Sequence, residues 1–132
     1  MTGRERLIFK NVSGIAGNEK IGLINLSDTE GERLISIVCE WETAKAIELR
    51  HNGEMDTRST LLDVMAKMIN ESMPDLYDFS INITGLKEEQ YITYILGPKP
   101  EQAYRIKASD AVLMSILTGM PIFIDSDLFR KQ

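Results

Sequence analysis

Histidine and cysteine are nearly absent from this 132-residue sequence, which contains one of each. The single cysteine, Cys39, excludes an internal disulfide and a thiolate zinc cluster. Its place beside an apolar strand predicts a small core residue and not a nucleophile. His51 falls near the end of an expected helix, where an imidazole suits the helix dipole. Because the sequence signals no partners for it, a Ser–His–Asp triad is not indicated.

Long apolar runs are also absent. No segment approaches the ~20 uninterrupted apolar residues that a membrane-spanning helix requires. Residues 1–6 are rich in charge and are not followed by the apolar region of a signal peptide. Together with the single cysteine, these features lead us to expect a cytoplasmic protein with no membrane partner. No GxGxxG or Walker pattern follows an expected strand, so these phosphate-binding loops are not predicted.

Positive charge is in deficit, and the formal net charge at pH 7 is −5. Non-specific nucleic-acid binding depends on lysines and arginines that neutralise phosphates. The sequence is therefore not that of a stable nucleic-acid binder. Nucleic acid as a transient substrate stays open, because bound metal ions can supply the local positive charge of an acidic nuclease.

Apolar residues make up 43% of the sequence, which is enough for one core. No repeat, low-complexity tract or linker divides the chain, so one domain over residues 1–132 is expected. We predict an α+β fold, with a mixed, largely antiparallel sheet and about three helices. Alternating or short apolar segments predict strands at 7–12, 21–26, 34–38, 79–83, 91–96, 103–106 and 122–124. Helical composition or spacing predicts helices at 41–50, from 59 or 60 to before Pro74, and at 109–118.

The last of these helices is apolar almost all round, so it is expected to be the most buried element. Gly119 is placed to cap its C-terminus, with Pro121 beyond. A helix between two late strands permits a parallel pairing there. Loop residues are expected at Ser13-Gly14, and the turn 87–90 should join two strands in a hairpin. Five methionines are expected to fill the core: Met65, Met68, Met73, Met114 and Met120.

Two carboxylates, Asp63 and Asp110, fall in the first turns of expected helices. One interpretation is structural, because an acid at a helix N-terminus bonds to free amides and complements the dipole. The other is functional: the two acids line one cleft with Arg58, Lys107 and Ser109. Carboxylates can hold a divalent metal that activates water, and a nearby Arg or Lys would bind phosphate. The spacing alone leaves both interpretations open.

Several short motifs follow one another between about Ile21 and Leu128. They are Ile35-Ser36-Ile37-Val38-Cys39-Glu40, Ala44-Lys45-Ala46-Ile47, Gly53, Arg58 with Asp63, Lys107-Ala108-Ser109-Asp110-Ala111, and Gly119-Met120-Pro121-Ile122-Phe123-Ile124. In order and spacing they resemble the bifunctional nuclease domain family. The family's corresponding motifs include Leu-Pro-Ile-x-Ile-Gly, Ala-x-Ala-Ile, Arg-Pro-x-Thr-His-Asp-Leu-Leu, Arg-Pro-Ser-Asp-Ala and Gly-x-Pro-Ile-x-Val.

The resemblance implies metal-assisted hydrolysis of phosphodiester bonds in DNA or RNA. Asp63 and Asp110 would be catalytic carboxylates and ligands of a divalent cation, Mg or Mn. Ser109 would be a third catalytic residue that orients the substrate. Arg58 and Lys107 would contact the substrate phosphate.

The sequence departs from the family motifs at polar positions. Leu62 replaces the motif histidine and Leu61 its threonine, which removes a possible base or ligand. Lys107 replaces the signature arginine and lacks its bidentate fork, and Ala108 replaces a proline. These departures favour an alternative: a catalytically inactive member that acts as an oligomeric protein-interaction or regulatory module.

A homo-oligomer, most simply a two-fold dimer, is expected from the apolar composition. A chain of this size with Trp41, Phe123, Phe129 and seven methionines is expected to leave apolar surface for a partner.

Overall fold

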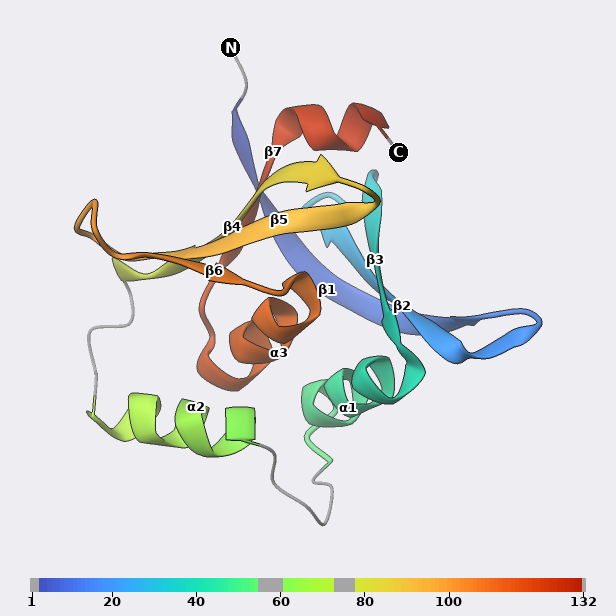
Figure 1. Ribbon diagram of the computed structural model, residues 1–132, viewed down its shortest axis with the longest axis horizontal. Coiled ribbons are helices and arrows are strands. Elements are labelled where there is room, and N and C mark those ends of the chain that lie inside the picture. Colours follow the sequence, from blue (N-terminus) through green and yellow to red (C-terminus); the bar gives the residue numbers. More distant parts are fainter. Residues whose placement is uncertain (1–2, 55–60, 73–77, 132) are drawn as a thin grey trace.

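The computed structural model describes residues 3–54, 61–72 and 78–131. In these ranges the chain forms seven strands, three α-helices and a C-terminal 3₁₀ helix (Figure 1). In chain order they are β1 (Arg4–Ile15), β2 (Asn18–Asp28), β3 (Leu34–Glu40), α1 (Trp41–His51), α2 (Leu61–Ser72), β4 (Ser80–Lys87), β5 (Gln90–Leu96), β6 (Ala103–Ile106), α3 (Ala108–Thr118), β7 (Ile122–Asp125) and the 3₁₀ helix Ser126–Lys131.

All seven strands belong to one sheet, in the order β3-β2-β1-β7-β4-β5-β6. Every neighbouring pair is antiparallel except β4 and β7, which run parallel through Ile81↔Ile122 and Ile83↔Ile124. The predicted α+β fold with a mixed, largely antiparallel sheet is therefore confirmed. The parallel pair occurs where expected, because α3 carries the chain back across the sheet before β7.

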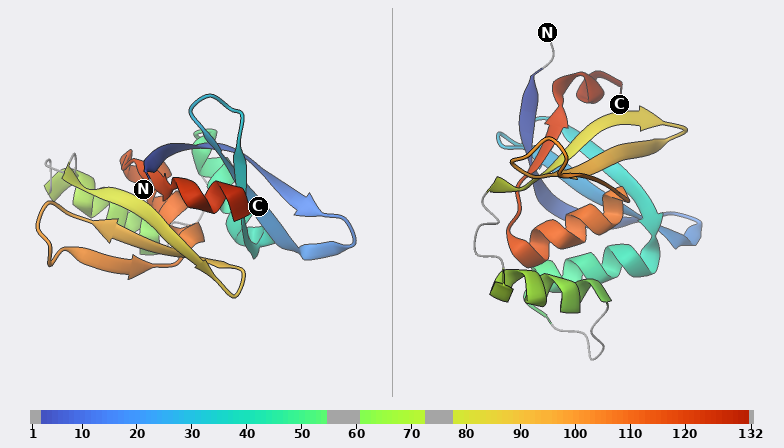
Figure 2. Two further views of the ribbon diagram at one scale, coloured as in Figure 1. Left: turned by 90° about the horizontal axis from the view of Figure 1, so that it is seen from above. Right: turned by 60° about the vertical axis from the view of Figure 1, so that its left-hand side comes forward.

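The sheet is strongly curled, and β5, near one edge, also contacts β3 at the other edge (Figure 1). All three helices lie on one side of the sheet (Figure 2). Helices α1 and α3 both pack directly against the strands, and α2 packs on α3. The inner face of the sheet and α3 together form the core. This curl brings the two edges of the sheet close to the start of α3.

Strand β1 is longer than predicted. Ser13 and Gly14 were expected in a loop, but they pair with Leu23 and Gly22 of β2. The Ser13 Oγ accepts a hydrogen bond of 3.2 Å from Asn25 Nδ2, so this polar segment is stabilised across the strands. The chain reverses three residues later at Gly17, whose φ of +84° suits glycine.

Helix α3 is the most buried helix of the described part of the chain, as predicted. Val112, Leu113 and Met114 are all buried, and α3 is packed by the sheet, α1 and α2. Burying each side chain of this size contributes ~1.5–3 kcal/mol to folding, which explains an apolar helix surface all round. Gly119 ends the helix with a φ of +82° and donates its N–H to the Ser115 carbonyl at 2.7 Å, also as predicted.

The five methionines do not share one environment. Met114 and Met120 are buried as predicted. The prediction was wrong for Met65 and Met68, whose exposed fractions are 44% and 61%. Helix α2 lies against one side of α3, so half of its own surface faces outward. Met73 lies outside the described residues. None of the helices in the described ranges has the length and apolar composition to cross a bilayer.

Candidate functional site

A cleft of about 450 Å³ lies between the two edges of the curled sheet. Strand β3 contributes Ile37 and Val38, and the β4–β5 turn contributes residues 88–91. The end of β6 and the start of α3, residues 105–109, form the remaining wall. Lys107 and Ser109, both predicted site residues, therefore lie in one cleft.

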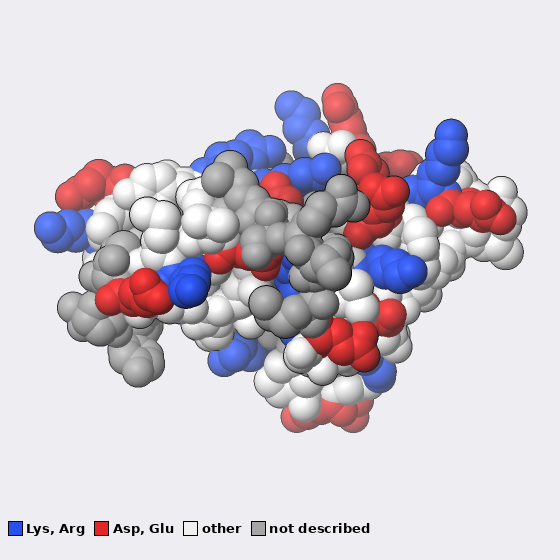
Figure 3. Space-filling view, turned by 90° about the horizontal axis from the view of Figure 1, so that it is seen from below, with Lys and Arg blue, Asp and Glu red and all other residues white. Residues whose placement is uncertain are grey.

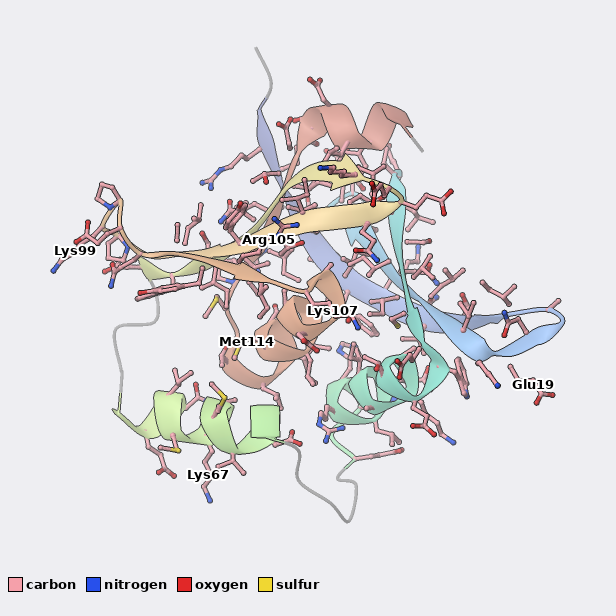
Figure 4. All side chains as sticks on the ribbon, viewed as in Figure 1. Glu19, Lys67, Lys99, Arg105, Lys107 and Met114 are labelled. Carbon is pink, nitrogen blue, oxygen red and sulfur yellow. The ribbon has the colours of Figure 1, made fainter. Side chains whose placement is uncertain are left out.

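The start of α3 gives this cleft a positive end. Lys107 is the N-cap residue, with an extended backbone, and its side chain makes no capping hydrogen bond. The first hydrogen bond of the helix runs from the Ala111 N–H to the Lys107 carbonyl, so the preceding N–H groups have no helical partner. Arg105 and Lys107 stand on either side of Ile106 at the β6–α3 junction (Figure 4). Amides at a helix N-terminus and two cations together attract anions.

Ser109 is the least satisfied polar residue of this junction. Its exposed fraction is 1%, and its hydroxyl oxygen has no hydrogen-bond partner among the described residues. Buried hydroxyl groups are almost always bonded, because leaving one unpaired costs about 1–3 kcal/mol. Since Ser109 also lines the cleft, a group bound there would supply the missing partner.

The β4–β5 turn places two carboxylates at the opposite wall. Lys87 pairs with Gln90, so Glu88 and Glu89 form a two-residue turn, with φ values of +53° and +67°. Such turns favour Asn-Gly, and a residue with a side chain at positive φ stores strain on the order of 1–3 kcal/mol. The sequence predicted this turn but gave the two glutamates no role. Their occurrence where Asn-Gly is usual is the signal that points to them.

Asp63 is held by an arginine. Arg50, at the end of α1, donates from Nε to Oδ1 at 2.7 Å and from Nη2 to Oδ2 at 2.6 Å. Its third nitrogen, Nη1, bonds to the Ala46 carbonyl at 3.1 Å. Both oxygens of the carboxylate thus accept a bidentate, charge-assisted pair that links α1 to the first turn of α2.

The other predicted site residues are placed as follows. Asp110 lies in the first turn of α3, half-buried, next in sequence to Ser109. Asp63 is in the first turn of α2, as predicted. Neither Asp63 nor Asp110 is among the described residues that line the cleft. Arg58 lies outside the described residues. The convergence of Asp63 with Asp110 stays a prediction.

The described residues do not fit a resident Mg or Mn ion. Within residues 3–54, 61–72 and 78–131, no three His, Cys, Asp or Glu side chains gather as metal ligands. A hard cation needs several free oxygen ligands, and the Asp63 oxygens already accept hydrogen bonds from Arg50. A metal site built on Asp63 and Asp110 remains a prediction.

Cys39 and His51 occupy the places that the sequence predicted for them. Cys39 is a buried residue of β3, and its burial raises the pKa of the thiol although the charge of Lys107 acts in the opposite direction. The neutral thiol is thus favoured, which suits a core residue. His51 ends α1, and its ring centroid lies 4.5 Å from that of Phe9.

Comparison with protein families identifies the family of this chain. The model of the bifunctional nuclease domain matches residues 24–132, and no curated protein matches the chain. The match includes the β3 edge, the β4–β5 turn and the β6–α3 junction that form the cleft. Because it spans most of the sequence, the chain belongs to the bifunctional nuclease domain family.

Proposed function

We propose that the protein hydrolyses phosphodiester bonds of DNA or RNA at the cleft beside the start of α3. The observation that carries this proposal is the buried Ser109 hydroxyl, which has no partner among residues 3–54, 61–72 and 78–131 and lies beside Lys107 at the N-terminus of α3. These groups are donors and positive charges, which is the chemistry that a phosphate requires. The family to which the chain belongs supports the same activity.

Each residue of the junction has a separate task in this proposal. Lys107 and the first amides of α3 hold the phosphate, and Ser109 donates a hydrogen bond to one of its oxygens. Hydrolysis requires a water to lose a proton as its oxygen attacks phosphorus, while the departing sugar oxygen gains one. In this proposal the acceptor of the water proton is Asp110, which follows Ser109 in the first turn of α3, at the border of the cleft lining.

The test is cleavage by the purified protein of single-stranded DNA, duplex DNA and RNA, each in Mg²⁺, Mn²⁺ or a chelator. We expect cleavage of at least one substrate. The reactions with chelator test whether cleavage requires a divalent cation, as a metal site that includes Asp63 would imply. Lys107→Met should slow cleavage about 10-fold, because it removes one charge-assisted hydrogen bond to the phosphate. Lys67→Met, on the exposed surface of α2, is the matched control and should cleave like the wild type. A wild-type protein that cleaves none of these substrates would contradict the proposal.

A non-catalytic, homo-oligomeric module is the second candidate. It is favoured by the three exposed apolar side chains on the outer surface of α2: Val64, Met65 and Met68. Contiguous exposed apolar residues often mark an interface, and a two-fold dimer is the simplest closed assembly. Light scattering at micromolar concentration tests it, and a monomer at every concentration would contradict it.

A further inference from the structure

We infer that the cleft binds a single unpaired nucleotide, with its phosphate at the start of α3 and its base against β3 and β5. This inference rests on the proposed function only for the phosphate. It adds the substrate class, which is a strand whose bases are free to leave the stack, as in single-stranded DNA or RNA.

The size of the cleft is the first support. A volume of about 450 Å³ lies in the lower half of the range for small-molecule sites, about 300–1,000 Å³. One nucleotide is a ligand of this class, whereas a duplex needs a long row of cations along its backbone. On the helical side of the molecule, the described lysines and arginines are interspersed with acidic side chains (Figure 3). That face is not a uniform basic surface.

The phosphate end is defined by donors. Lys107 and Arg105 supply charge, and Ser109 supplies the buried hydroxyl without a partner. Ala108 is the first helical residue of α3 and carries a backbone N–H, which a proline at this position would lack. This N–H is one more donor at the end of the cleft where an anion would bind.

Apolar side chains and an aromatic ring also line the cleft. Val38 is 58% exposed although it is a valine in a strand, and Tyr91 and Ile106 lie in the same lining. A base that stacks on a tyrosine and covers such side chains gains ~1–3 kcal/mol, whatever its identity. Contact with a base therefore explains why the cleft has apolar residues, whereas binding of phosphate alone would not.

Charge fixes the orientation of the nucleotide. Glu88 and Glu89 line the cleft and have positive φ in the β4–β5 turn, which Figure 1 shows apart from the start of α3. Two carboxylates repel a phosphate but accept hydrogen bonds from the amino groups of a base. The phosphate thus belongs beside Lys107, and the base edge belongs beside the turn.

Two-dimensional NMR of the full chain, titrated with GMP or with inorganic phosphate, tests the inference. GMP is expected to shift the amide signals of Ala108 and Ser109 and also those of Val38 and Tyr91. Inorganic phosphate is expected to shift only the signals at the start of α3. GMP that leaves the signals of Val38 and Tyr91 unchanged would overturn the inference.

Two variants and one competition sharpen the test. Tyr91→Leu should weaken GMP binding about 5-fold and leave phosphate binding unchanged, with a melting curve as the control for folding. A single-stranded oligonucleotide should displace half of the labelled GMP at a concentration at least about 10-fold lower than the duplex of the same sequence requires. A duplex that competes equally well would overturn the inference. Nucleotide binding without cleavage would refute hydrolysis alone, and cleavage without nucleotide binding would refute this inference alone.

Discussion

Two polar clusters of this molecule differ in how completely their groups are bonded. Asp28, at the end of β2, is buried and accepts hydrogen bonds from the Glu32 N–H at 2.8 Å and from Arg33 Nε at 3.0 Å. Arg33 also pairs with Glu5 and stacks its guanidinium 4.4 Å from the Phe129 ring centroid. Every charge in this cluster has a partner from the protein itself.

The β6–α3 junction is the opposite case. Ser109 is as buried as Asp28, but its hydroxyl has no partner among the described residues, and the N-cap residue Lys107 makes no capping hydrogen bond with its side chain. Across the cleft, Glu88 and Glu89 hold a strained turn. A protein tolerates such costs where a ligand supplies the missing contacts, whereas a saturated cluster stabilises the fold. The comparison distinguishes polar groups that are bonded within the protein from those that we propose a ligand bonds.

The largest expected effect is on activity, at Asp110. If this carboxylate accepts the proton of the attacking water, Asp110→Asn should lower the cleavage rate about 100-fold or more. It should lower the free energy of unfolding by only about 1 kcal/mol, the worth of a charge–dipole contact. Cleavage assays and urea denaturation of the same preparations measure both quantities. Unchanged cleavage would make Asp110 structural and would favour the non-catalytic candidate.

The next effect is on stability, at the Arg50–Asp63 pair. Asp63→Asn removes the charge from a part-buried, bidentate pair, so the free energy of unfolding should fall by about 2 kcal/mol. Denaturation of this variant, of Arg50→Met and of the double variant forms a mutant cycle. A coupling energy near zero would show that the pair does not hold the start of α2.

The helices and most strands were predictable because their apolar spacing is local. The order of the sheet was not, because β1 and β7 pair residues more than a hundred positions apart, such as Leu7 and Ile122. The error at Ser13 has a similar cause, since its partners in β2 decide that it lies in a strand. Met65 and Met68 fit a helical pattern, but only the packing of α2 shows which of its sides is buried.

The candidate site was predictable only where its residues are close to one another in the sequence. Lys107 and Ser109 belong to one short motif, so the sequence places them together. Val38 and Glu88 join them only because the sheet curls and brings its edges to the start of α3. The pairing of Asp63 with Arg50 depends on how α1 and α2 meet, which spacing does not reveal.

Ser109 and Ser36 give a matched test of bonding. Ser109→Ala removes a buried hydroxyl without a partner and should raise the free energy of unfolding by about 1 kcal/mol while it weakens phosphate binding. Ser36 donates to Asn25 Oδ1 at 2.7 Å, so Ser36→Ala should lower stability by about 1 kcal/mol. Urea denaturation measures both variants. Equal destabilisation would mean that the Ser109 hydroxyl is already satisfied.

The smallest expected effect is a pH dependence of stability that arises from Asp28, in the cluster with Arg33 and Glu5. Burial raises the pKa of Asp28, but hydrogen bonds from the Arg33 side chain and from the backbone N–H groups of Arg33 and Glu32 outweigh it and hold the pKa below its ordinary value of 3.8. A group with a lowered pKa in the folded state stabilises the protein above the unfolded pKa. That contribution is lost as the pH falls through the folded pKa.

Asp28→Asn tests this dependence directly. At pH 7 the wild type should be more stable than the variant, and the difference should shrink as the pH falls below about 4. Urea denaturation of both proteins between neutral pH and the acid transition measures the difference. A gap that stays constant over this range would mean that Arg33 and the turn amides do not favour the charged carboxylate. The hydrogen bonds to Asp28 would then not stabilise the fold. The cluster around Asp28 could no longer be contrasted with Ser109 as an example of polar groups that are fully bonded within the protein.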